Sequence, residues 1–142
     1  MKRILISITW LLLLVALFIV LFITIYWEPD RSVESLKERW AQTPSQFIEI
    51  EGMQVHIRDE GPRNDLSPIV LLHGTSASLH TWDEWTRLLK NEHRIIRFDL
   101  PGFGLTGPSP NNDYTIENYA RILITVLDDL KIDHAILAGN SL

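Results

Sequence analysis

The most apolar part of the sequence is an uncharged run from Ile4 to Trp27. At about 1.5 Å per residue, a helix over this run reaches roughly 36 Å, and the hydrocarbon core of a bilayer is about 30 Å thick. The run therefore predicts an uncleaved transmembrane signal-anchor helix at residues 4–27. A cleaved signal peptide, which has a shorter apolar region and a small-residue cleavage site, is one alternative, and a buried core helix is the other.

Charged residues flank this run unequally. Lys2 and Arg3 precede it, whereas Glu28 and Asp30 follow it. Positive charge is enriched on the cytoplasmic side of membrane spans. We therefore expect residues 1–3 in the cytoplasm and the rest of the chain outside it, in the periplasm if the source is a Gram-negative bacterium.

A polar stalk at residues 28–45 follows. Within it, Val33, Leu36 and Trp40 recur at near-helical spacing and predict a short amphipathic helix from about residue 31 to 41. Its apolar face could lie on the lipid surface or pack on the chain's own domain, and the second arrangement is favoured.

The remaining residues carry strand patterns. Two alternating apolar runs in residues 46–60 surround Glu51-Gly52, which predicts a hairpin whose turn uses the positive φ of glycine. Short β-branched runs at residues 68–72, 94–98 and 134–138 predict three more strands.

Helical patterns lie between these strands. Residues 80–90 place apolar side chains on one face, and residues 115–130 do the same after a predicted N-cap at Thr115 with Glu117 in the first turn. An antiparallel hairpin followed by alternating strands and helices predicts an α/β fold with a mostly parallel sheet. The predicted apolar faces consist of Trp82, Trp85, Leu88 and Leu89 in the first helix, and of Ile116, Tyr119, Ala120, Leu123, Leu127 and Leu130 in the second.

The composition of the chain excludes several classes of function. The 142 residues carry a net charge of −5, which gives no basic surface for nucleic acid. The chain has no cysteine, which excludes disulfides, thiolate metal sites and a cysteine nucleophile. Gly102, Gly104 and Gly107 match the dinucleotide-binding spacing, but Pro108 and a polar run separate them from the next helix, so we expect a turn-rich loop. No cofactor or metal is predicted.

The chain ends on Gly139-Asn140-Ser141-Leu142, which matches the first four residues of the G-x-S-x-G nucleophile elbow. A strand precedes it, as that turn requires. The earlier strand at residues 68–72 leads into His73-Gly74-Thr75, where an oxyanion loop would lie. The backbone N–H groups of Thr75 and Leu142 are the candidate oxyanion donors, and His73 is expected to order the loop by hydrogen bonding rather than to act as a base.

Five segments together resemble the α/β-hydrolase superfamily, in that family's order: VHIRDEG, IVLLHGTSASLHTW, RIIRFDLPGFGLTG, YTIENYARILITVLDDLKI and AILAGNSL. The resemblance covers residues 46–142. It implies strands that end at His73-Gly74, at Asp99 and at the elbow, with Ser141 at the nucleophile position. Haloalkane dehalogenases and epoxide hydrolases of the superfamily use Asp there, so serine favours esterases, lipases, amidases and carbon–carbon bond hydrolases.

The resemblance also implies which catalytic parts lie elsewhere. The triad of this fold runs Ser, acid, His along the chain, and every histidine of this sequence precedes Ser141. None of them is the expected base, and Asp99 is not the expected acid. Residues 46–142 are thus expected to be the N-terminal half of the domain, inactive alone and with an exposed apolar edge at residues 135–138.

These observations predict a membrane-anchored serine hydrolase that acts on a carboxylic ester or related acyl substrate through an acyl-serine intermediate. The expected partners are a small-molecule acyl or ester substrate, with apolar esters suited to a membrane tether, and the lipid bilayer around residues 4–27. The alternatives are a non-catalytic binding protein of the same fold, an anchored interaction domain with accidental motifs, or an inert truncated gene product.

Overall fold

The computed structural model describes residues 2–29 and 31–141, which form two units divided after Arg31. The first unit contains helix α1 (Lys2–Tyr26). Its stretch Ile8–Tyr26 has a mean hydropathy of 3.0 and exposed side chains, which suits a membrane span and equally a signal sequence. The expected orientation across the membrane stays a prediction.

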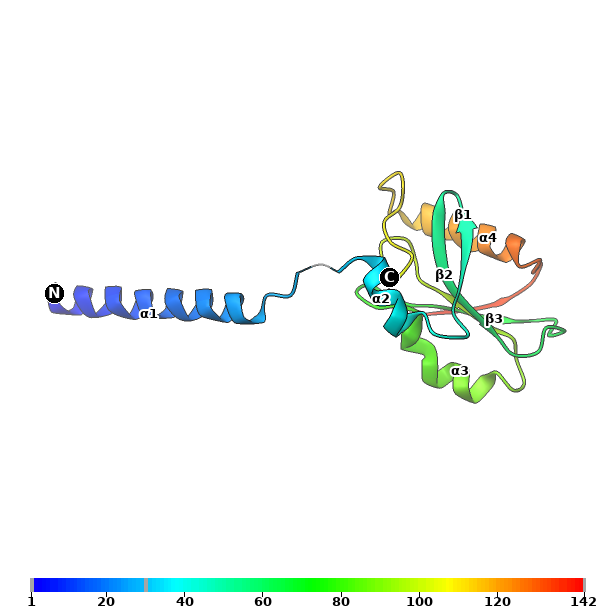
Figure 1. Cartoon of the computed structure of the whole chain (residues 1–142), viewed down its shortest axis with the longest axis horizontal. Coiled ribbons are helices and arrows are strands. Elements are labelled where there is room, and N and C mark those ends of the chain that lie inside the picture. The colour runs from blue at the N-terminus through cyan, green and yellow to red at the C-terminus, as the bar shows by residue number, and fades with distance from the viewer. Residues whose placement is uncertain (1, 30, 142) are drawn as a thin grey trace. The chain divides into compact units, whose positions relative to one another are not determined.

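The second unit is built on a five-stranded mixed sheet with the order β1-β2-β4-β3-β5 (Figure 1). Strands β1, β2 and β4 pair antiparallel in turn, whereas β3 lies parallel to both β4 and β5. This is the predicted hairpin joined to a parallel sheet. The strands are β1 (Gln46–Ile50), β2 (Met53–Glu60), β3 (Ile69–Leu72), β4 (Ile95–Phe98) and β5 (Ile136–Gly139).

The turn between β1 and β2 shows why the hairpin register is fixed. Ile50 pairs with Met53, which leaves the two-residue loop Glu51-Gly52. Glu51 has φ 51° and Gly52 has φ 82°. Both central residues of a type I′ turn require positive φ. The sequence predicted positive φ at Gly52 only, but Glu51 adopts it as well.

Two helices cover opposite faces of the sheet, α4 (Ile116–Asp129) on one and α3 (Asp83–Leu89) on the other (Figure 1). Successive side chains of β3 point to opposite faces of the sheet. Val70 packs in the core with α4, whereas Leu71 packs with Trp82 on the other face. A 3₁₀ turn at Leu79–Trp82 precedes α3. Helix α2 (Val33–Trp40) lies within the predicted segment, begins at the N-cap Ser32 and packs on the domain.

The predicted apolar face of α3 is partly wrong. Trp82 is buried, but Trp85 and Leu88 are 58% and 68% exposed. Thr86 takes the buried position instead. In a helix of 3.6 residues per turn, Trp82 and Thr86 lie about 40° apart on the buried face, whereas Trp85 lies about 100° and Leu88 about 160° from Thr86.

The buried face of α4 is rotated from the predicted one. Thr115 is the N-cap as predicted, and its hydroxyl accepts a hydrogen bond from the Asn118 N–H. Ile116 and Ala120 are exposed, however, and line a shallow apolar groove beside Leu72 and Leu100. The helix instead buries Asn118, Tyr119, Ile122, Leu123 and Val126.

Candidate active site

The turn after β5 holds Ser141 in an uncommon conformation. Asn140 N–H continues the ladder by donating to the Leu72 carbonyl at 3.2 Å, and Ser141 then adopts φ 49°. A non-glycine residue at positive φ costs energy and is found mostly where the surrounding structure imposes it. The side chain of Ser141 is exposed at the carboxyl end of the parallel strands, where ligands bind in open α/β sheets.

The loop after β3 lies directly against this turn. A Cβ on Gly74 would overlap the carbonyl oxygens of Asn140 and Ser141, so only glycine allows the approach. Thr75 N–H donates to the Ser141 carbonyl at 3.1 Å. The structure thus brings together two motifs that are far apart in the sequence, but the Thr75 N–H is bonded to the elbow itself rather than open. Leu142, the other oxyanion candidate, lies outside the described residues.

His73 connects this loop to the one after β4. Its buried ring accepts a hydrogen bond at Nε2 from Leu100 N–H, 3.0 Å away, and Nδ1 lies 2.8 Å from the Gly74 carbonyl. A backbone N–H can only donate and a carbonyl can only accept, so the proton is on Nδ1. Both ring nitrogens of His73 are thus engaged in ordering the two loops.

Asp99, directly after β4, organises the surrounding loops. Its carboxylate accepts hydrogen bonds from Leu79 N–H at 2.7 Å and Leu105 N–H at 2.8 Å, and it lies 2.8 Å from His56 Nδ1. Burial by itself raises the pKa of Asp99, but the hydrogen bonds from His56 and from the two backbone groups outweigh it and lower the pKa below its ordinary value of 3.8. Asp99 is therefore a buried, ionised carboxylate.

The glycine-rich loop wraps around this carboxylate. A Cβ on Gly104, which has φ 52°, would overlap the Asp99 carboxylate. Gly102 N–H donates to the Gly107 carbonyl at 2.6 Å, closing the loop on itself. The glycines let the backbone turn tightly around Asp99, in agreement with the turn-rich loop that the sequence predicts.

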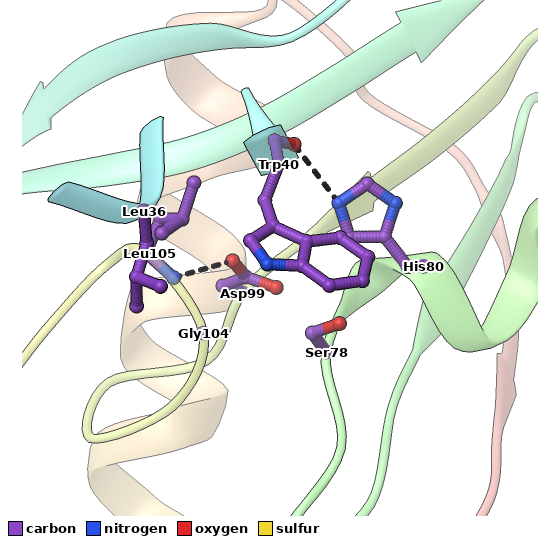
Figure 2. Close-up of a pocket in the computed structure, with 7 residues that line it drawn as sticks. All are labelled: Leu36, Trp40, Ser78, His80, Asp99, Gly104 and Leu105. Atoms are coloured by element: carbon purple, nitrogen blue, oxygen red, sulfur yellow. Dashed lines mark hydrogen bonds between the residues drawn. The ribbon is translucent and has the colours of Figure 1, made fainter. Parts of the chain in front are cut away.

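A cavity of about 190 Å³ opens beside Asp99 (Figure 2). His80 Nε2 lies 3.0 Å from the Trp40 carbonyl, which holds the end of α2 at the rim. The sequence identified Leu36 and Trp40 as an apolar face, but it gave no signal for His80 or Ser78, because their position depends on contacts between distant segments. Ser141 is not among the described residues that line this cavity, which are Leu36, Trp40, Ser78, His80, Asp99, Gly104 and Leu105.

Residues 2–29 and 31–141 contain no group of three or more His, Asp or Glu side chains that could hold a metal ion. Of the predicted site residues, Gly139, Asn140, Ser141, Gly74 and Thr75 meet at the carboxyl ends of β3 and β5, with His73 behind them. The sequence did not predict that Asp99 and His56 form a buried pair. His56 lies between Val55 and Ile57 on β2, and no local pattern marks it as the partner of Asp99.

Comparisons with known proteins agree with this architecture. The family described as alpha/beta hydrolase fold matches residues 67–142. A haloalkane dehalogenase of Psychrobacter cryohalolentis is 37% identical over 87 residues, which are 60% of this chain and 28% of that protein. The esterase YbfF of Escherichia coli is 36% identical over 92 residues, covering 63% of this chain and 35% of that protein.

A solved structure, the Cif epoxide hydrolase of Acinetobacter nosocomialis, superposes with a TM-score of 0.66 at 28% identity, covering 77% of this chain and 36% of that one. The chain thus spans about a third of the length of the relatives it matches. The family match and the superposed fold lead to one conclusion: the chain belongs to the α/β-hydrolase superfamily.

Proposed function

We propose that the protein is a membrane-anchored serine hydrolase in which Ser141 attacks a carboxylic ester or a related acyl substrate. The observation that carries the proposal is the backbone of Ser141, at φ 49° after β5 and packed on Gly74. Such strain concentrates at functional sites, and the turn leaves the hydroxyl exposed. An aspartate nucleophile, as the resemblance implies for dehalogenases and epoxide hydrolases, is absent from this position.

The proposed reaction begins when the Ser141 hydroxyl oxygen attacks the substrate carbonyl and its proton passes to a histidine base. Neither that base nor the acid that orients it is among the residues placed at the elbow, so both would come from beyond Leu142. The oxyanion would be held by the N–H groups of Thr75 and Leu142. That role would require the Thr75 N–H, which donates to the Ser141 carbonyl at 3.1 Å, to turn toward the substrate instead.

The apolar helix α1 supports the proposed location. Residues 4–27 would anchor the enzyme in the bilayer with residues 1–3 in the cytoplasm, which brings the domain near lipids and other apolar esters. Because the chain has no cysteine, a single Ser67→Cys substitution on an exposed loop would report its side of the membrane. We expect a membrane-impermeant maleimide to label intact cells. Labelling only after lysis would place the domain in the cytoplasm.

The nucleophile is tested on the full gene product, purified in mild detergent. We expect a fluorophosphonate to form an adduct at Ser141, and Ser141→Ala to lower ester hydrolysis by about 10⁴- to 10⁶-fold. Ser67→Ala, also a serine in a loop, serves as the matched control and should leave hydrolysis unchanged. A folded protein with no adduct at Ser141 and no hydrolysis would favour the non-catalytic binding protein instead.

A further inference from the structure

A second serine of the domain already has a histidine and an aspartate as partners. Ser45 lies directly before β1 and is half-buried. Its Oγ is 2.8 Å from Nε2 of His56, and Nδ1 of His56 is 2.8 Å from Oδ2 of Asp99. The three groups come from separate segments that only the folded chain brings together.

The hydrogen-bond partners of Asp99 place one proton of this network. Asp99 accepts from two backbone N–H groups, so its third partner, His56 Nδ1, also carries a proton that it donates. In a neutral imidazole with its proton on Nδ1, Nε2 carries a lone pair, and this atom faces Ser45. The serine hydroxyl can donate to it, while its oxygen accepts a hydrogen bond from Arg58 Nε at 2.9 Å.

This is the arrangement that activates a serine, namely a base at hydrogen-bond distance and an acidic group that orients the base. The imidazole is fully buried between Asp99 and the ring of Phe47, whose centroid lies 5.1 Å away. The half-buried Ser45 is its more accessible neighbour. Arg58 is itself held by the Gln42 carbonyl at 3.3 Å, which keeps its positive charge beside the serine oxygen.

We propose that Ser45, His56 and Asp99 form a second nucleophilic site, which accepts small activated acyl groups such as those of aryl esters. The Ser45 oxygen bonds to the acyl carbon while its proton moves to His56 Nε2. The ester C–O bond then breaks, and the proton passes from His56 to the departing phenoxide, leaving O-acyl-Ser45 and a phenol. The guanidinium of Arg58 stabilises the oxyanion between these steps. The site is independent of the function proposed for Ser141.

The test uses the 142-residue chain in mild detergent, with Ser141→Ala to silence the other candidate nucleophile. The protein is treated with 4-nitrophenyl acetate or a fluorophosphonate, digested with trypsin and analysed by mass spectrometry. The tryptic peptide of residues 40–58 contains Ser45 as its one serine, and fragmentation of the peptide distinguishes an adduct on Ser45 from one on Thr43 or His56. We expect modification of this peptide at least about 100-fold faster than that of Ser35 in the same sample, because general base catalysis contributes roughly 10²–10⁴-fold.

Ser35 is a matched internal control, since it is exposed and its hydroxyl donates to the Ser32 carbonyl rather than to a base. His56→Gln should reduce the rate at Ser45 by a similar factor of about 100, with folding checked by circular dichroism. Equal rates at Ser45 and Ser35, or an unmodified peptide 40–58 in folded protein, would overturn the proposal whether or not His56→Gln folds. Labelling of Ser141 in the unsubstituted full gene product is a separate outcome that bears on the other site alone.

Discussion

Strands β4 and β5 flank the same strand in the same register, yet their surroundings differ. Ile69 of β3 pairs with Ile95 on one side and Ile136 on the other, and Leu72 pairs with Phe98 and Gly139. All four residues of β4 are buried, whereas three of the four residues of β5 are exposed. Their apolar composition is similar, so the difference arises because β4 has β2 on its far side and β5 is the edge strand of the described sheet.

The residues that follow these strands differ in the same way. Asp99 follows β4 and is enclosed by hydrogen bonds, while Asn140 follows β5 at the equivalent register and is exposed. The β4 end is therefore a polar support enclosed by hydrogen bonds, and the β5 end leaves its turn exposed. The nucleophile proposed at Ser141 would need this combination of an exposed hydroxyl and a fixed neighbouring loop.

The largest expected contrast is in core packing. Phe98→Ala removes a fully buried ring and should lower the free energy of unfolding by about 3–5 kcal/mol. Leu137→Ala, at a side chain that is 54% exposed, is the control and should cost less than about 1 kcal/mol. Urea unfolding of the detergent-purified protein, followed by tryptophan fluorescence, measures both. Similar losses would show that β5 is buried in solution.

This contrast marks what the sequence alone could predict. The β-branched runs located all three parallel strands within two residues, because local composition determines that a segment is a strand. It does not determine which helix face meets the sheet, so Leu88 and Ile116 were assigned to the wrong side. The pairing of His56 with Asp99, 43 residues apart, was also not predicted, because it depends on strand order rather than on any local pattern.

The second contrast concerns the residues after the two strands. Asp99→Asn should lower the free energy of unfolding by roughly 3 kcal/mol, because the amide cannot replace the charge that His56 and two backbone N–H groups surround. Asn140→Ala removes an exposed side chain and should change it by less than about 0.5 kcal/mol. Both are measured by the same urea titration. A loss below 1 kcal/mol for Asp99→Asn would mean that the network is weaker in solution than its geometry indicates.

A pair of glycines gives a smaller and more local contrast. Gly104→Ala forces a methyl group against the Asp99 carboxylate at positive φ and should cost about 1–3 kcal/mol of stability. Gly74→Ala meets the carbonyls of Asn140 and Ser141, which lie at the less constrained edge. We expect the elbow to shift with little loss of stability, and fluorophosphonate labelling of Ser141 in the full gene product to fall. Unchanged labelling in Gly74→Ala would show that the loop at Gly74 does not position Ser141.

The smallest contrast is a dependence on pH. The pKa of Asp99 is lowered in the folded protein, so its ionised form stabilises the fold above the unfolded value of about 3.9, and that stabilisation is lost as the pH falls toward the folded pKa. A single group changes the stability by at most about 1.4 kcal/mol per pH unit. The stability difference between the protein and Asp99→Asn should therefore shrink as the pH falls below about 4. Asn140→Ala is the control, and its stability difference from the protein should not change with pH because Asn140 does not titrate. If the stability difference for Asp99→Asn were also independent of pH, hydrogen bonding rather than charge would be what stabilises the β4 end.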